Sequence, residues 1–300
     1  MLKNTDKNLT KGLILTILGA IAWGFSGTCG QYLMNYKNVD STYLANVRLI
    51  FGGLLLIIFA IFKYKKDAFR IFKNKKDTIT LILFGVLGML FSQFAYLQAI
   101  YYTNAPTATT LQFLSSIFIV LITCFKENRL PKKIEILAIL LAILGTFTLS
   151  THLDISKLVI NPLGLVWALI SALGIVACTL LPLEIMPKYT SFVVNGFGMF
   201  FGGIALSIFT KPWNITVNFD TGIILGFIGI VLIGTILAFS FFLYGVTIIG
   251  PVKGSLIAGL ESVSALIFSV LFLKEIFSLY DILGMALILF AVSALNFIDN

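Results

Sequence analysis

The chain has 300 residues, of which 59% are hydrophobic and only 11% are charged, and its mean hydropathy is +1.02. A soluble domain usually carries about 25% charged residues, so this chain needs a lipid solvent around most of its perimeter. Its net charge of +8 is spread between apolar runs rather than gathered on one face, which argues against a nucleic-acid partner.

Ten apolar runs follow one another along the chain, each close to the ~20 residues that an α-helix needs to cross a bilayer. They lie at 12–34, 41–62, 79–101, 105–124, 134–151, 162–183, 191–210, 221–243, 251–273 and 279–298. All seven prolines fall near the borders of these runs, where a missing N–H does least harm. The sequence therefore predicts an all-α membrane protein of ten long, uninterrupted transmembrane helices.

The first run follows Lys3, Lys7 and Lys11, as the apolar part of a secretory signal would. It is longer than such a segment (about 7–15 residues) and lacks a small-residue cleavage site, so we expect a retained helix.

Lys and Arg are distributed unevenly over the segments between the runs. With the N-terminus placed in the cytoplasm, fifteen fall in cytoplasmic segments and four in external ones. The positive-inside rule therefore predicts a multi-pass protein of the cell (inner or plasma) membrane with both termini cytoplasmic. The bias comes from the first half of the chain, and the second half is nearly neutral.

An internal repeat is visible at an offset of 148 residues, where Tyr96 to Glu127 matches Tyr244 to Glu275. In both segments a tyrosine ends one helix, a short turn follows, and a span runs into a Lys-Glu pair. Because each half holds five spans, an odd number, the second half enters the membrane upside down. The sequence predicts two inverted five-helix repeats, residues 1–151 (helices 1–5) and residues 152–300 (helices 6–10).

The residues that carry enzyme or metal chemistry are scarce. Cys29, Cys124 and Cys178 lie far apart, no CxxC pair exists, and His152 is the single histidine. A metal site, a cofactor and a membrane-embedded enzyme are therefore not expected. The chain also lacks a phosphate-binding GxxxxGK[ST] loop, so ATP is not its direct energy source.

Short motifs in both halves resemble those of one family. They are Ala22-Trp23-Gly24-Phe25-Ser26 in the first span, Arg48 in the second, Lys126-Glu127-Asn128-Arg129-Leu130 after the fourth, Leu260-Glu261-Ser262 in the ninth and Lys274-Glu275-Ile276 after it. In this order they resemble the ten-helix EamA-type members of the drug/metabolite transporter superfamily. The resemblance covers nearly the whole chain and implies transport of small organic solutes, often amino acids or their analogues.

The chain departs from this family pattern at two pairs of positions. Leu114 and Ser262 stand where the family has a proline, and Lys126 and Lys274 stand where it has a glycine. A proline kink that opens the fourth and ninth helices is therefore not expected here.

Glu261 is the strongest functional candidate, because ionisable groups inside a membrane are costly and are functional candidates by default. It lies ten residues after Pro251 and twelve before Leu273, near the middle of the membrane. We expect it to couple protons or to contact a cationic group of the substrate. The alternative is a structural carboxyl that is hydrogen-bonded to a neighbouring helix.

Arg48, about two turns into the second helix, has a similar pair of interpretations. The structural interpretation is an ion pair or a helix-end contact. The functional interpretation is a gate residue, or a handle that binds a substrate carboxylate through two parallel hydrogen bonds.

Uncharged polar and aromatic side chains complete the expected binding site. Hydrogen-bonding groups around a cavity suit a zwitterion or a polar metabolite, whereas interhelical hydrogen bonding is the plainer alternative. The substrate-binding candidates besides Glu261 are Trp23, Ser26, Gln93, Tyr96, Thr109, Gln112 and Tyr244. Asn195 is a further buried polar group without an assigned use.

Together these features predict a secondary transporter, and more specifically an exporter of amino acids or related small metabolites that works by alternating access. A channel, or a flippase for lipids or sugar conjugates, is the alternative for the same fold. The expected partners are the substrate, protons as the candidate coupling ion, and the lipid bilayer. The protein is expected to be a monomer or a homodimer.

Overall fold

The structure is a computed structural model that describes residues 2–154 and 158–295, and within these ranges its regular elements are all helical. The α-helices are α1 (Leu2–Asn35), α2 (Ser41–Tyr64), α3 (Lys75–Leu83), α4 (Phe91–Tyr102), α5 (Ala105–Gln112), α6 (Ser115–Lys126), α7 (Lys133–Thr151), α8 (Pro162–Leu180), α9 (Ser191–Thr210), α10 (Thr221–Ile228), α11 (Ala238–Ile249), α12 (Pro251–Ala258), α13 (Leu260–Leu273) and α14 (Leu279–Leu295). Three short 3₁₀ helices are η1 (Lys65–Lys73), η3 (Leu181–Glu184) and η4 (Pro212–Asn214), and two π-helical segments are η2 (Phe84–Leu90) and η5 (Gly229–Leu237).

These elements form the ten spans that the sequence predicts. Within the described residues, nine helical stretches are long and apolar enough to cross a membrane, and α14 is a shorter apolar tenth. Asp40, Asn104, Asn161 and Asp220 cap the helices that follow them by accepting backbone N–H groups. The predicted all-α membrane fold is confirmed.

The expectation of uninterrupted helices is wrong for four of the spans. The fourth span breaks between α5 and α6, where the N–H groups of Phe113 and Leu114 donate to carbonyls three residues back, at 3.1 Å each. The ninth span breaks at Gly259, whose N–H donates to Leu256 in the same way. A local 3₁₀ turn thus bends both helices without a proline. The third and eighth spans contain η2 and η5 at matching places in the two halves.

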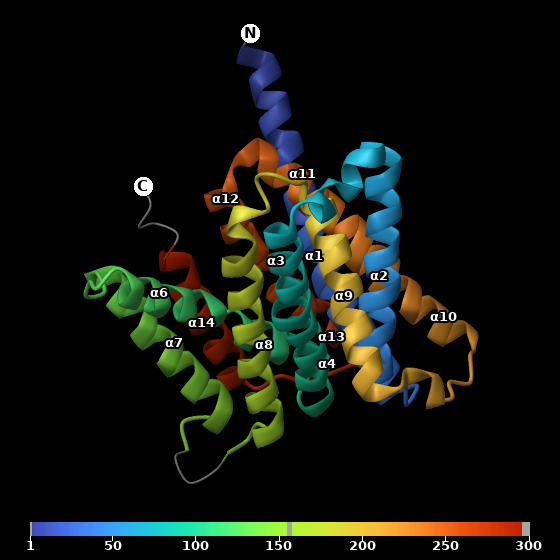
Figure 1. The fold of residues 1–300 in the computed structure, drawn as a ribbon. Helices are drawn as coiled ribbons and strands as arrows, with labels where there is room; N and C mark the ends of the chain where they lie inside the picture. Colours follow the sequence, from blue (N-terminus) through green and yellow to red (C-terminus); the bar gives the residue numbers. More distant parts are fainter. Residues whose placement is uncertain (1, 155–157, 296–300) are drawn as a thin grey trace.

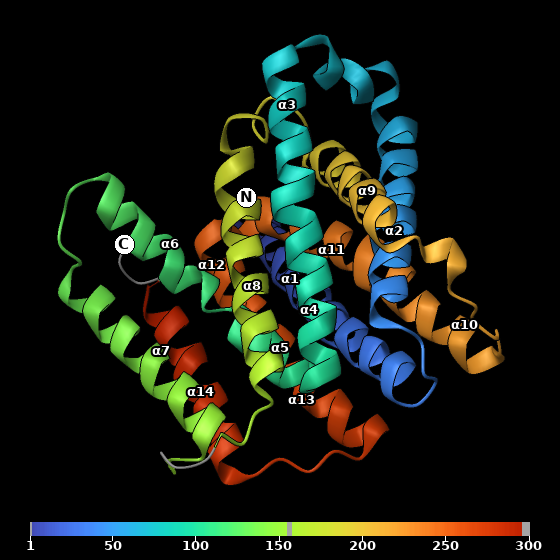
Figure 2. The same cartoon turned by 60° about the horizontal axis from the view of Figure 1, so that its bottom comes forward.

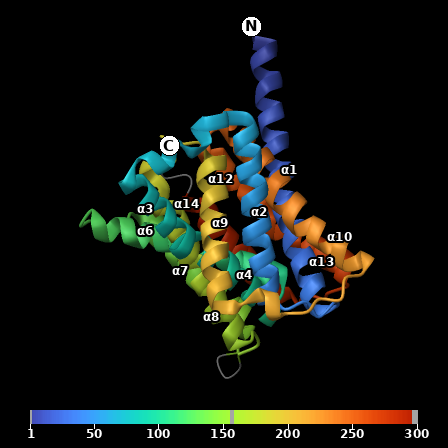
Figure 3. The same cartoon turned by 45° about the vertical axis from the view of Figure 1, so that its right-hand side comes forward.

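The packing of the spans follows a two-fold pattern. α1 of the first half packs against α11 and α12–α13 of the second half, and α8 of the second half packs against α4 and α5–α6 of the first. α2 packs against α9, as Figure 3 shows, and α7 packs against α14 at one side of the molecule (Figure 2). Exchanging the two halves maps each of these pairs onto another pair or onto itself. The arrangement is that of two inverted five-helix repeats.

Glycines let several of these helices approach closely. A Cβ on Gly24 of α1 would lie 2.5 Å from the Glu261 carbonyl oxygen, and one on Gly53 of α2 would lie 2.7 Å from the Phe200 nitrogen. Small residues at helix crossings are the usual means of tight packing in membranes. Gly24 therefore brings α1 against the segment of α13 that carries Glu261.

Candidate functional site

A cavity of about 280 Å³ lies in the centre of the helix bundle. Side chains from α1, α2, η2, α4, α5, α8, α9, α11 and α13 line it, while α7 and α14 stay outside (Figure 1). Among its lining residues are seven that the sequence singles out: Trp23, Arg48, Gln93, Tyr96, Gln112, Asn195 and Glu261. The predicted candidates thus converge from both halves of the chain on one space.

Arg48 and Glu261 bring opposite charges to this cavity from different repeats. Arg48 is only 6% exposed, and its Nε is buried without a hydrogen-bond partner among the described residues. Glu261 lies in the first turn of α13, directly after the break at Gly259. No ion pair joins the two side chains within the described part of the chain. Both charged groups are therefore available to a ligand.

Two amides of the cavity differ in what they contact. Gln112 of α5 donates to the Ser171 hydroxyl of α8, which donates to the Ser92 carbonyl at 2.9 Å, so this amide also joins helices. The Gln93 Oε1 is buried without a partner among the residues that the structure describes. A buried unpaired acceptor costs about 1–3 kcal/mol, which a donor on a ligand would offset.

An aromatic wall closes one side of the cavity. The ring of Trp23 lies 5.2 Å from that of Phe239, edge to face, and 4.7 Å from that of Phe242. Phe239, Phe84 and Met89 line the cavity but were not singled out from the sequence. Apolar residues are so frequent in a membrane chain that no sequence signal distinguishes those that face the cavity.

Three predicted site residues do not line the cavity. Ser26 is 1% exposed, and its side chain packs directly against Gly234, where any added Cβ would clash with the Ser26 Oγ. Thr109 lies behind Tyr96, and the two hydroxyls are 2.8 Å apart. Tyr244 is 50% exposed and lines a separate hollow at the N-terminal end of the bundle. The centre of its ring lies 5.6 Å from the Lys11 Nζ.

Polar contacts tie helices together at the end of the bundle opposite the N-terminus. Gln31 of α1 donates to Glu275, just beyond α13, and accepts from the N–H of Ala105 at the start of α5 at 2.8 Å. Tyr36 donates to the Leu273 carbonyl at 2.9 Å. Burial raises the pKa of Glu275, which the hydrogen bond from Gln31 opposes. These contacts fasten three cavity-lining helices to one another at this end.

The matching Lys-Glu motif of the first half has different partners. Glu127 accepts from Arg129 at 2.7 Å, and Arg129 also donates to Glu135 at 2.8 and 2.9 Å. The two carboxylates raise the pKa of Arg129. This network stays within the first repeat, so the two ends of the bundle are not equivalent.

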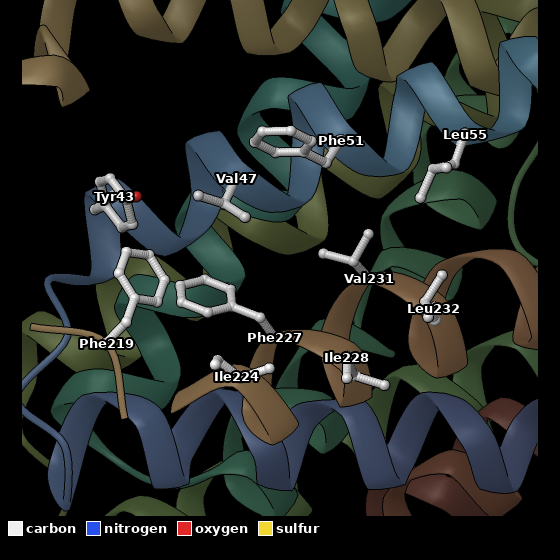
Figure 4. A pocket seen from close by; sticks show the side chains of 10 residues that line it. All are labelled: Tyr43, Val47, Phe51, Leu55, Phe219, Ile224, Phe227, Ile228, Val231 and Leu232. Atoms are coloured by element: carbon white, nitrogen blue, oxygen red, sulfur yellow. The ribbon is translucent and has the colours of Figure 1, made fainter. Parts of the chain in front are cut away.

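A second hollow, of about 390 Å³, lies between α2 and the α10–η5 segment. Figure 4 shows its lining side chains, which are aliphatic or aromatic, with the Tyr43 hydroxyl as their one polar group. Such a surface suits lipid tails and offers no charge to a polar solute. Within the described residues, no cluster of His, Cys, Asp and Glu could hold a metal ion.

The comparisons with known proteins agree with this architecture. The EamA-like transporter family matches twice, at residues 10–151 and 162–297. The chain is 37% identical over 282 residues to the uncharacterized inner membrane transporter YicL of Salmonella typhimurium, covering 94% of each protein. One crystal structure shares the fold with a TM-score of 0.60 at 17% identity, over 94% of this chain and 95% of that one. The chain therefore belongs to the EamA-like transporter family, and it is a membrane transporter rather than an enzyme.

Proposed function

We propose that this protein is a secondary transporter that exports amino acids or closely related small metabolites by alternating access. Its relative YicL is named an inner membrane transporter, and we assign this chain to the same membrane with both termini in the cytoplasm. The loop charges support this orientation. The cavity is built within one chain, so a monomer is sufficient for transport.

The observation that carries this proposal is the pair of opposite charges in one small cavity. Arg48 offers a planar pair of donors for a carboxylate, and Glu261 offers an acceptor for an ammonium group. At about 280 Å³, the cavity is at the small end of ligand pockets, which span about 300–1,000 Å³. A zwitterion the size of an amino acid matches both the charges and the volume.

Because Arg48 and Glu261 come from different repeats, a zwitterion between them touches both moving halves. Rocking of one repeat against the other then changes access while the ligand stays near the middle of the membrane. In the absence of a ligand, Glu261 can take a proton instead, which makes it the candidate for proton coupling.

Counterflow in proteoliposomes tests this function. Vesicles are loaded with one unlabelled amino acid at a time, and uptake of the same labelled compound is followed. A carrier shows transient accumulation of label above equilibrium for at least one amino acid, whereas a channel shows none. Failure of all amino acids, together with accumulation of a lipid or sugar conjugate, would overturn the proposal in favour of a flippase.

Arg48→Lys tests the assignment of the carboxylate partner. Lysine keeps the charge but loses the two parallel hydrogen bonds, so we expect about a tenfold or larger rise in KM for the amino acid that exchanges. Arg70→Lys, on the exposed η1 segment, is the matched control and should leave KM unchanged. Equal KM values for both variants would remove the carboxylate role of Arg48.

A further inference from the structure

A third hollow, of about 540 Å³, opens at the N-terminal end of the bundle between α1, α2, α9 and α11. It is distinct from the central cavity, although α9 and α11 contribute side chains to both. Asn195 of α9 and Phe239 of α11 line the cavity, whereas Phe192 and Ser240 of the same two helices line this hollow. Two of its lining residues, Lys11 and Lys63, are cationic, and none is acidic. We call it the lysine hollow.

Both lysines lie over aromatic rings rather than beside carboxylates. The Lys11 Nζ is 5.6 Å from the centre of the Tyr244 ring, and the Lys63 Nζ is 5.5–5.9 Å from the rings of Tyr64, Phe192 and Phe59. In the described part of the chain neither ammonium forms an ion pair. Two like charges in one partly apolar hollow repel each other, and an anion between them would relieve that repulsion.

Further donors point to the same kind of ligand. α9, a helix of 20 residues, begins at Ser191 on the wall of the hollow, and no side chain caps it. The N-terminus of a helix carries partial positive charge and favours anions. Beside it, the Thr190 Oγ1 is buried without a partner among the described residues. The hollow thus combines two ammonium groups, a helix N-terminus and an unpaired hydroxyl.

The rest of the hollow is apolar. Leu15, Phe59, Phe241 and Leu243 line it together with the polar groups. Lys11 lies near the start of span one, which begins at Leu9, and Lys63 lies in the last turn of α2, at the depth where lipid headgroups meet the hydrocarbon region. A small hydrophilic anion would leave this apolar wall uncovered, whereas a phospholipid matches both parts.

We propose that the lysine hollow binds an anionic phospholipid, with the headgroup phosphate between Lys11, Lys63 and the start of α9 and an acyl chain along the apolar wall. Basic pockets between transmembrane helices on the cytoplasmic side are a general mode of anionic lipid recognition. The inference concerns a site separate from the transport cavity and does not depend on the transported substrate.

The test measures lipid binding to the full-length protein. The protein is placed in nanodiscs of phosphatidylglycerol or of phosphatidylcholine, and the lipids that it retains on transfer to detergent are counted by native mass spectrometry. We expect the wild type to retain phosphatidylglycerol preferentially. Lys11→Gln with Lys63→Gln should weaken this retention about thirtyfold. Lys66→Gln with Lys73→Gln, which removes the same charge from exposed positions, should not.

Equal loss in both double variants would overturn the proposal, because it would indicate nonspecific attraction to surface charge. Equal retention of the two lipids by the wild type would overturn it as well. Glycerol 1-phosphate distinguishes a soluble ligand from a lipid: if it displaces phosphatidylglycerol at equal concentration, the site is not a lipid site. Should the lysine double variant fail to fold, Thr190→Val provides the second test, with a several-fold loss of retention expected from removal of the hydroxyl.

Discussion

The hydroxyls of Tyr96 and Thr109 lie 2.8 Å apart and join the third span of the first repeat to the fourth. Tyr96 is a cavity residue, and Thr109 holds it from behind. Thr109→Val should therefore destabilise the protein by about 0.6 kcal/mol, and by no more than about 1.7 kcal/mol, the range for interhelical hydrogen bonds in membranes. Unfolding by denaturant in detergent micelles measures this change.

The double variant serves as the control for this contact. Tyr96→Phe together with Thr109→Val removes both partners, so it should be closer to wild-type stability than the sum of the single changes predicts. Additive losses would show that the two hydroxyls do not stabilise each other.

Glu261→Gln should abolish the dependence of transport on a proton gradient while leaving binding of a neutral analogue in place. The amide keeps the shape of the carboxyl but cannot take up a proton, and it offers no charge to an ammonium group. Transport with and without an imposed pH gradient measures this effect. Wild-type pH dependence in the variant would refute the coupling role and favour a structural carboxyl.

Gly24→Ala should impair transport and lower stability by about 1–3 kcal/mol, the usual cost of overpacking. The new methyl group would lie 2.5 Å from the Glu261 carbonyl and would push α13 away from α1. Gly30→Ala is the matched control on the same helix, because its Cβ would meet the flexible ends of the Leu97, Ile230 and Leu44 side chains, at 3.2, 3.7 and 4.0 Å. Similar losses in both variants would argue against a specific role for the Gly24 contact.

Gln31→Leu should favour opening of the bundle at the end opposite the N-terminus. It leaves the Ala105 N–H and the Glu275 carboxyl without their partner, at a cost of about 1–3 kcal/mol to the closed arrangement. The native Cys178 thiol lines the cavity, and in a Cys29→Ser, Cys124→Ser background its faster reaction with a membrane-impermeant thiol reagent from that side reports the opening. Unchanged labelling would show that other contacts hold this end closed.

The closed end should also respond to pH through Glu275. Since burial raises the pKa of Glu275, its protonated form favours closure. This preference is fully present below the ordinary pKa of about 4.3 and is lost as pH rises through the raised value. Glu275→Gln, which cannot ionise, should remove the part of the pH dependence of Cys178 labelling that exceeds the intrinsic pH dependence of a free thiol. Persistence of that excess would exclude Glu275 as its source.

Much of the central cavity could be predicted from the sequence because its polar members are conspicuous in an oily chain. Arg48, Gln93, Gln112 and Glu261 stand out against their neighbours for that reason, and their inward direction follows from the cost of exposing them to lipid. Phe239 and Met89 could not be found in this way, because their chemistry is that of the lipid-facing majority.

The candidates that lie outside the cavity have a different origin. Ser26 and Thr109 are polar enough to suggest a cavity, but hydroxyls in membrane helices are satisfied equally well by packing between helices. The bends in the fourth and ninth spans escaped prediction because proline was taken as their only cause. At Phe113, Leu114 and Gly259 the bend comes from backbone N–H groups that donate to the carbonyl three residues back. Any residue other than proline can make this hydrogen bond, so it leaves no signal in the sequence.

Two of the interfaces, α2 with α9 and α7 with α14, join each helix to its own counterpart in the other repeat. Such self-matching contacts are what a two-fold dimer of identical chains would make. A half-length ancestor could have formed this bundle only if it inserted into the membrane in both orientations, which requires a weak preference for either side. The second half has such a weak charge preference, so the lysines and arginines of the first half are expected to set the direction in which the joined chain inserts.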